Sequence, residues 1–137
     1  MTPSQRLTSG TGKRIAGLMP VFEPGDIVRA PFPYTDRNTE QHRPALVISG
    51  MPLGPGGRLI WILMITSAEN RPWDGDVSFG DNYGEAGLPA PSVIRTAKIA
   101  TVEAERLSPL GRAPQAVLSA VRRRLNAIVT LPPGDQP

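Results

Sequence analysis

The sequence contains no cysteine and only one histidine. Without cysteine there are no disulfides or thiolate metal sites, and a single histidine excludes a metal site built from several imidazoles. Carboxylate oxygens could still hold Mg²⁺. No apolar run is long enough to span a membrane, and no convincing signal peptide is present. These absences predict a cytoplasmic protein with no membrane segment and no cofactor.

Aromatic residues make up 5% of the chain and apolar residues 39%, which suffices for one compact core in 137 residues. Proline and glycine are abundant, at 16 and 14 residues, and favour short segments joined by turns. We expect a flexible N-terminal tail over 1–21, one domain over 22–131 and a C-terminal tail over 132–137.

Positive charge exceeds negative charge, with 15 basic and 12 acidic residues and a net charge of +3. All the basic residues except Lys13 and Lys98 are arginines, whose planar guanidinium binds phosphate bidentately. Between 95 and 124 the only acids are Glu103 and Glu105. This distribution favours nucleic acid or an acidic protein as partner. The run 122–124 fits either phosphate contacts or a solvated helix face.

The hydrophobic pattern predicts a mainly β domain. Expected strands cover 27–32, 45–49 and 58–66, the last buried on both faces with Trp61 in the core, followed by short strands around 77–79, 92–96 and 98–102. One helix is expected over 114–129, because Val117, Val121, Leu125 and Ile128 form one stripe. Short strands with one closing helix suggest a small, partly open β-barrel.

Two polar residues flank the expected strands. Arg43 precedes Pro44 at the start of the strand over 45–49, and Thr66 ends the strand over 58–66. If these strands are antiparallel neighbours, the start of one lies beside the end of the other. A guanidinium and a hydroxyl meeting there suit a phosphate. The plainer interpretation is a solvated arginine and a hydroxyl at a strand end.

Several motifs occur together in an order that resembles the PemK/MazF toxins of bacterial type II toxin–antitoxin systems. The resemblance covers 22–131 and rests on 24–28 (PGDIV), 31–36 (PFPYTD), 42–49 (HRPALVIS), 65–67 (ITS), 92–96 (SVIRT) with the following Lys98-Ile99, and Gly111 before the closing helix. The loop before His42 is shorter than in many members, and the N-terminal tail is longer.

The resemblance implies an SH3-like, partly open β-barrel of the CcdB/PemK type with a C-terminal helix, usually a homodimer. It implies sequence-specific, metal-independent cleavage of single-stranded RNA such as mRNA, which inhibits translation and growth. It also implies inhibition by an acidic antitoxin. The catalytic roles of the family map to Arg43 and Thr66.

RNA cleavage needs no metal, because the 2′-hydroxyl is an internal nucleophile that must be oriented and deprotonated while the charged phosphorane is stabilised. Histidine is the usual general base at neutral pH, which makes His42 a candidate, yet adjacent strand residues point to opposite faces and His42 follows this rule next to Arg43. The RNA contacts are predicted at His42, Ser67, Arg37, Lys98 and Trp73, the last as a base-stacking residue.

Three alternatives stay open. The acids Asp74, Asp76, Asp81 and Glu85 could hold Mg²⁺, or they are solvated turn residues. A barrel of this type could act by binding protein, as the gyrase-poisoning CcdB toxins do, although the ending 132–137 lacks their Trp-containing motif. A third alternative is a member that binds RNA and does not cut it.

Overall fold

The computed structural model describes residues 21–33 and 40–134. The predicted N-terminal tail, apart from Val21, and the predicted RNA contact Arg37 lie outside these residues. The elements in chain order are β1 (Asp26–Pro33), β2 (Glu40–Val47), the 3₁₀ turn η1 (Pro55–Gly57), β3 (Leu59–Ser67), β4 (Val77–Ser78), η2 (Gly80–Tyr83), β5 (Ser92–Glu103), η3 (Ala104–Arg106), β6 (Ser108–Arg112) and α1 (Gln115–Ile128).

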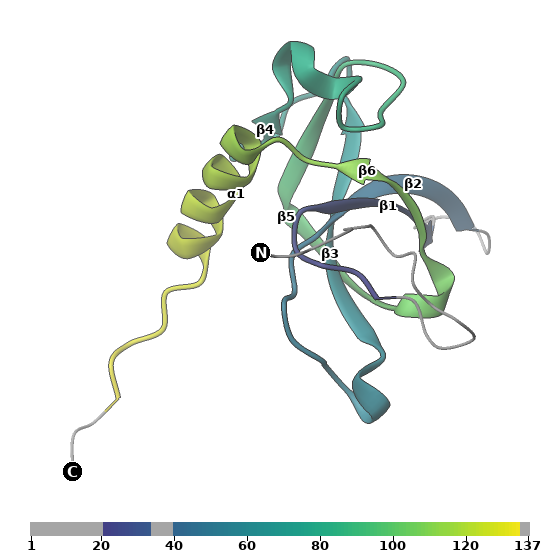
Figure 1. Ribbon diagram of the computed structural model, residues 1–137. Helices are drawn as coiled ribbons and strands as arrows, with labels where there is room; N and C mark the ends of the chain where they lie inside the picture. The colour runs from purple at the N-terminus through teal and green to yellow at the C-terminus, as the bar shows by residue number, and fades with distance from the viewer. Residues whose placement is uncertain (1–20, 34–39, 135–137) are drawn as a thin grey trace, which may run out of the picture.

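All six strands belong to one antiparallel sheet, in the order β4-β5-β3-β2-β1-β6. The sheet curls into a half-barrel, and α1 stands along one side of it (Figure 1). The predicted class, a mainly β barrel with a C-terminal helix, is confirmed. None of the helices in residues 21–33 and 40–134 is long and apolar enough to cross a membrane.

The strand β2 begins five residues earlier than the predicted strand over 45–49 and ends at Val47. It pairs with β1 from Glu40 to Leu46, but with β3 only from Ala45 to Val47. Arg43 therefore lies inside β2, because pairing with β1 extends the strand through polar residues. Pro44 falls where β2 has β1 as its only paired neighbour, and such edge positions tolerate a residue without an N–H.

The strand β5 is continuous, where the sequence predicted separate strands over 92–96 and 98–102. Its register with β3 shifts, because Leu63 pairs with Ile99 whereas Ile65 pairs with Ile94. The four residues 95–98 therefore stand opposite Met64 alone. This bulge bends the strand without ending it.

The sequence did not predict β6, which contains Pro109 and Gly111 and has no alternating pattern. It forms by pairing with β1 at the edge of the sheet, so that Ile27 lies beside Gly111. The buried Asp26 carboxylate accepts a hydrogen bond from Arg112 at 2.8 Å, which ties β1 to β6. A Cβ atom at Gly111 would collide with the carbonyl oxygen of Ala86.

Strand alternation divides the apolar residues between two cores. The barrel core, inside the curled sheet, comprises Val28, Ala30, Phe32, Ala45, Val47, Ile62 and Leu107. The helix-side core, between the sheet and α1, comprises Ile27, Leu46, Leu63, Ile65, Phe79, Ala86, Leu88, Ile94, Ala113, Val117 and Val121.

Two burial predictions need correction. Trp61 is 46% exposed and not in the core. It shares one face of β3 with the buried Leu63 and Ile65, but it lies nearer the start of the strand, outside the helix-side core. On the helix stripe, Val117 and Val121 are buried, but Ile128 is 48% exposed because the last turn of α1 extends past the sheet (Figure 1).

Candidate functional site

Arg43 and Thr66 lie on neighbouring antiparallel strands. Their registers place Ala45 opposite Met64, and two more residues along the same register would set Arg43 across from Thr66. Both residues share the strand face that carries the barrel core, since Ala45 alternates with Arg43 and Ile62 with Thr66. Both side chains follow the apolar residues of that face along their strands, and we call this part of the face the polar end of the barrel core.

Each of these side chains is held by a neighbouring amide. The Arg43 guanidinium donates to the Gln41 side-chain oxygen at 2.7 Å, two residues back on the same face of β2. The Asn70 side-chain amide donates to the Thr66 hydroxyl oxygen at 2.7 Å. Because this bond uses Thr66 as acceptor, the hydroxyl proton stays available for a ligand oxygen. Thr66 is 6% exposed, so its position is well fixed.

Asn70 reaches Thr66 through a tight turn after β3. Its backbone N–H donates to the Ser67 carbonyl oxygen at 3.1 Å, and the Ser67 hydroxyl accepts the N–H of Glu69 at 3.1 Å. Sequence reasoning missed both Gln41 and Asn70. The two-residue spacing of Gln41 from Arg43 was a usable signal, whereas the Asn70 contact depends on the turn geometry.

The structure separates His42 from the pair. His42 is exposed and adjacent to Arg43 in β2, so strand alternation puts it on the helix-side face, with Leu46. Ser67 likewise alternates away from Thr66. An imidazole on the opposite face of the sheet is poorly placed to serve as base at Arg43 and Thr66.

Two other predicted contacts lie on β5 and in the loop after β3. Lys98 is half-buried in the β5 bulge and alternates with Ala100, which packs on the barrel core. Trp73 lies in the loop after β3, with 41% of its surface exposed, and the Arg95 guanidinium carbon sits 4.4 Å from its ring centre.

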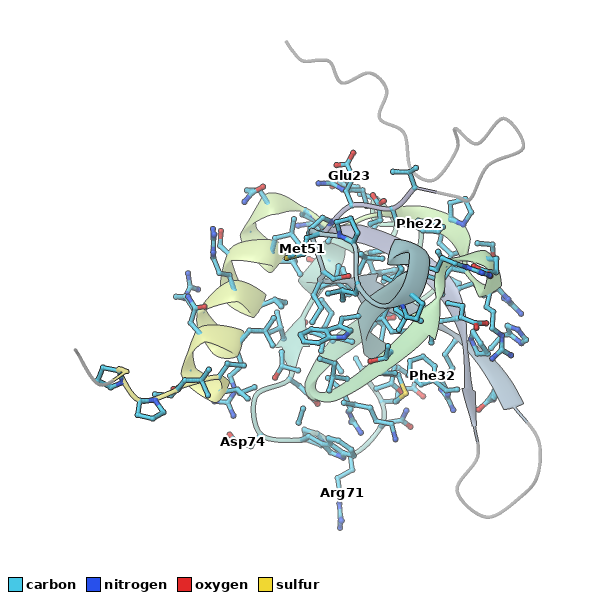
Figure 2. All side chains as sticks on the ribbon, turned by 90° about the horizontal axis from the view of Figure 1, so that it is seen from below. Phe22, Glu23, Phe32, Met51, Arg71 and Asp74 are labelled. Carbon is cyan, nitrogen blue, oxygen red and sulfur yellow. The ribbon has the colours of Figure 1, made fainter. Side chains whose placement is uncertain are left out.

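The acids of the proposed magnesium cluster point to other partners. Asp74 pairs with Arg124 at 3.2 Å, and Asp76 with Arg95 at 3.5 Å. Among the residues that the structure describes, no three acidic or histidine side chains gather as metal ligands. Figure 2 shows Asp74 and Arg71 on one loop, at the opposite side of the view from Phe22 and Glu23.

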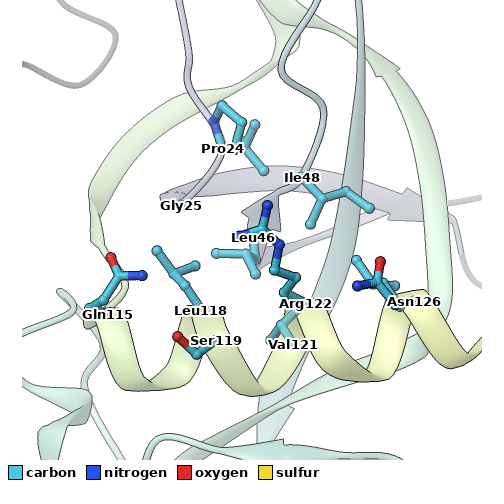
Figure 3. Close-up of a pocket in the computed structure, with 12 residues that line it drawn as sticks. Pro24, Gly25, Leu46, Ile48, Gln115, Leu118, Ser119, Val121, Arg122 and Asn126 are labelled. Atoms are coloured by element: carbon cyan, nitrogen blue, oxygen red, sulfur yellow. The ribbon is translucent and has the colours of Figure 1, made fainter.

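A pocket of about 420 Å³ lies elsewhere, between α1 and the neighbouring ends of β1 and β2. Leu118, Val121 and Arg122 of α1 face Leu46 and Ile48 across it (Figure 3). Leu46 belongs to the helix-side core, so this pocket opens on the face of β2 opposite Arg43. It is therefore separate from the polar end of the barrel core.

Comparison with known proteins adds two findings. The family model for the PemK-like, MazF-like toxin of type II toxin–antitoxin systems matches residues 23–129. No curated protein matches the chain.

Among solved structures, the chain resembles MazF from Deinococcus radiodurans in crystal form I, with 22% identity, a TM-score of 0.58, and coverage of 77% of this chain and 94% of that one. It also resembles two MazE–MazF structures from that organism. Form II has 22% identity, a TM-score of 0.58, and coverage of 77% of this chain and 92% of that one. Form III has 21% identity, a TM-score of 0.57, and coverage of 77% of this chain and 94% of that one. These likenesses show a shared fold.

Proposed function

We propose that this chain, which belongs to the PemK-like, MazF-like toxins of type II toxin–antitoxin systems, is an endoribonuclease that cleaves single-stranded RNA without a metal ion. Cleavage of mRNA would inhibit translation and growth. The supporting observation is that Arg43 and Thr66 share one face at the polar end of the barrel core, each fixed by an amide side chain.

The chemistry follows from those two groups. The 2′-oxygen of the RNA attacks the adjacent phosphorus and the 5′-oxygen leaves, which gives a 2′,3′-cyclic phosphate and a 5′-hydroxyl. The proton lost by the 2′-hydroxyl is matched by one gained by the leaving oxygen. Arg43 stabilises the added negative charge on the phosphorane oxygens, and the Thr66 hydroxyl orients the phosphate.

Binding of the RNA strand uses positive charge and one aromatic ring around this pair. Lys98 supplies charge on the same face, and Trp73 supplies an exposed ring in the loop after β3. His42 and Ser67 point to the other face, where they would contact flanking nucleotides that wrap the edge of the sheet. Arg37 completes the predicted contacts.

The decisive experiment is cleavage of a long single-stranded RNA by the purified protein in excess EDTA. We expect full activity and products with 2′,3′-cyclic phosphate, or 3′-phosphate after its hydrolysis, and 5′-hydroxyl ends. Strict dependence on Mg²⁺ with 5′-phosphate ends would contradict the mechanism. Growth arrest in cells without RNA cleavage would favour a toxin that acts by binding protein.

The partners follow from the same proposal. MazE–MazF structures among the neighbours support an antitoxin as partner, and an acidic one would complement the arginines of this chain. A second copy of the chain would cover the exposed Trp61 and Ile99, which are 46% and 52% exposed on the helix-side face of β3 and β5. Sedimentation should then detect a dimer, and Ile99→Asp should weaken it.

A further inference from the structure

The loop between β3 and β4 is fixed by side chains of β5. The Arg95 guanidinium donates to the carbonyl oxygen of Arg71 at 2.5 Å, and the Thr96 hydroxyl donates to that of Gly75 at 2.8 Å. Within the loop, the N–H of Trp73 donates to the Asp76 carboxylate at 2.9 Å. A loop of polar residues is therefore held in one conformation, although most of its side chains are exposed.

The two residues that hold the loop lie in the β5 bulge opposite Met64, and they are almost completely buried. Arg95 is 6% exposed and Thr96 is 4% exposed. Burying an arginine is costly unless its charge is paired and its hydrogen bonds are made. Here the pairing is incomplete, because the nearest Asp76 oxygen lies 3.5 Å away.

Two buried atoms of this cluster have no hydrogen-bond partner among residues 21–33 and 40–134: the Arg95 Nε and the second carboxylate oxygen of Asp76. A leucine or methionine at position 95 would fill the bulge without these costs. The guanidinium does what such a residue cannot, since it lies 4.4 Å from the centre of the Trp73 ring and attracts the ring electrostatically.

Trp73 is thus a large aromatic ring supported by a buried cation, with 41% of its surface left open. The same loop carries Asn70, whose amide binds the Thr66 hydroxyl at 2.7 Å. Arg71, which lies between these two residues in the sequence, projects away from the body of the molecule (Figure 2). An exposed ring, a projecting cation and a link to the site are the parts that single-stranded nucleic-acid grooves combine.

We propose that Trp73 is a stacking platform for one base of the RNA, and that Arg95 is the positioning residue that holds its ring. The proposal rests on the proposed function, because it assigns a base subsite for the RNA that Arg43 and Thr66 are proposed to cleave. Stacking does not depend on base-edge hydrogen bonds, so this subsite accepts any base and contributes binding strength.

The two tryptophans of the chain make a direct test possible. A Trp61→Phe protein has Trp73 as its sole tryptophan and is titrated with a mixed-sequence deoxyribonucleotide 10-mer, which lacks the 2′-hydroxyl and is not cut. Indole fluorescence reports stacking, and the anisotropy of a labelled 10-mer reports binding. The matched control is Trp73→Phe, which keeps only Trp61, an indole that lies on the helix-side face of β3 and is 46% exposed in the single chain.

We expect the 10-mer to quench Trp73 and to leave Trp61 unquenched. An abasic strand of equal length should bind without quenching Trp73, since it offers phosphates and no base. Trp73→Ala should weaken 10-mer binding about 5- to 150-fold, and should raise the KM for RNA with little change in kcat. Arg95→Gln should weaken binding about 2- to 5-fold, and Arg95→Lys should restore part of the quenching.

Binding of the 10-mer without any change in Trp73 emission would overturn the stacking proposal and leave the nuclease proposal standing. A 10-mer and an RNA that both fail to bind would overturn both. The Arg95→Gln substitution is compared with Arg95 in the Trp61→Phe protein, and circular dichroism checks that both fold. Equal quenching of Trp73 in the two proteins would contradict the positioning role of Arg95. Quenching by an acidic peptide, with none by the 10-mer, would assign the ring to a protein partner and contradict the proposal.

Discussion

At the residue scale, the proposed catalytic pair consists of two side chains whose free hydrogen-bonding capacity is limited by one amide each. Gln41 occupies one edge of the Arg43 guanidinium, and Asn70 occupies an acceptor position of the Thr66 hydroxyl. Both side chains keep donor capacity, which matches the oxygens of a phosphate. Three predictions belong to this scale.

Arg43→Ala should lower the rate of RNA cleavage by about 10²–10³-fold, the usual effect of removing a donor that stabilises transition-state charge. Folding should survive, because the guanidinium is only half-buried. The control is Arg29→Ala, an exposed arginine of the adjacent strand on the opposite face. A cleavage rate in Arg43→Ala equal to that of the wild type would refute the assignment.

Thr66→Val should abolish most cleavage while RNA binding stays nearly unchanged, because the hydroxyl is lost and the shape is kept. Thr66→Ser should retain part of the activity, and Asn70→Ala should fall between the two as it only frees the hydroxyl to rotate. Thr101→Val, which removes an exposed hydroxyl of β5, is the control. Full activity in Thr66→Val would make Thr66 a structural residue only.

Asp26 should make stability depend on pH. Burial raises the pKa of its carboxyl above the ordinary value of 3.8, although hydrogen bonds from the Glu23 N–H and from Arg112 oppose the rise. The native state then holds this proton more tightly than the unfolded state. The contribution of this raised pKa to the free energy of unfolding is therefore complete below pH 3.8. It is lost as the pH rises through the raised native pKa.

Asp26→Asn keeps the shape of the carboxyl and does not ionise. The free energy of unfolding of the wild type, relative to this variant, should fall as the pH is raised through the acid range from about 3. Urea denaturation at a series of pH values measures it. A relative stability that rises with pH would show that Arg112 holds the pKa below its ordinary value.

At the scale of elements, the edge strand β6 depends on two glycines that let backbones touch. A Cβ atom at Gly111 would collide with the Ala86 carbonyl oxygen, and one at Gly87 with that of Leu110. Gly111→Ala should therefore lower the free energy of unfolding by about 1–3 kcal/mol. Gly84→Ala, where nothing lies within 4 Å, should change it by less than about 0.5 kcal/mol. Equal effects of the two substitutions would contradict this account.

The elements also show which contacts a sequence can predict. The antiparallel pairing of β2 with β3 was predictable, because short strands joined by a Gly/Pro turn pair with each other. The pairing of β6 with β1 was not, since Pro109 and Gly111 weaken any strand pattern and the partner lies far away in the chain. Arg95 was missed for a similar reason: its burial arises from a bulge that only pairing with β3 creates.

At the scale of the whole molecule, positive charge should govern both kinds of ligand. RNA and an acidic antitoxin segment should compete for the same basic surface. Both should bind more weakly as salt rises, because salt screens charges beyond about 8–10 Å and RNA binding releases counterions. A competition titration at two salt concentrations measures this. Simultaneous binding without mutual weakening would move the partner elsewhere, and the pocket beside Arg122 would be the first place to examine.

The pairing of β1 with β6 also determines how much of the chain must be synthesised before the sheet can be completed. Ile27 meets Gly111 only after more than 80 further residues have left the ribosome. At about 5–20 residues per second, β1 waits on the order of ten seconds for its second neighbour. Contacts so distant in sequence also slow folding in general. During that interval the partners β2 and β3 are synthesised, but the sheet is still open at the edge that β6 will occupy. The sheet of this chain is therefore completed only after nearly all of the domain has been synthesised.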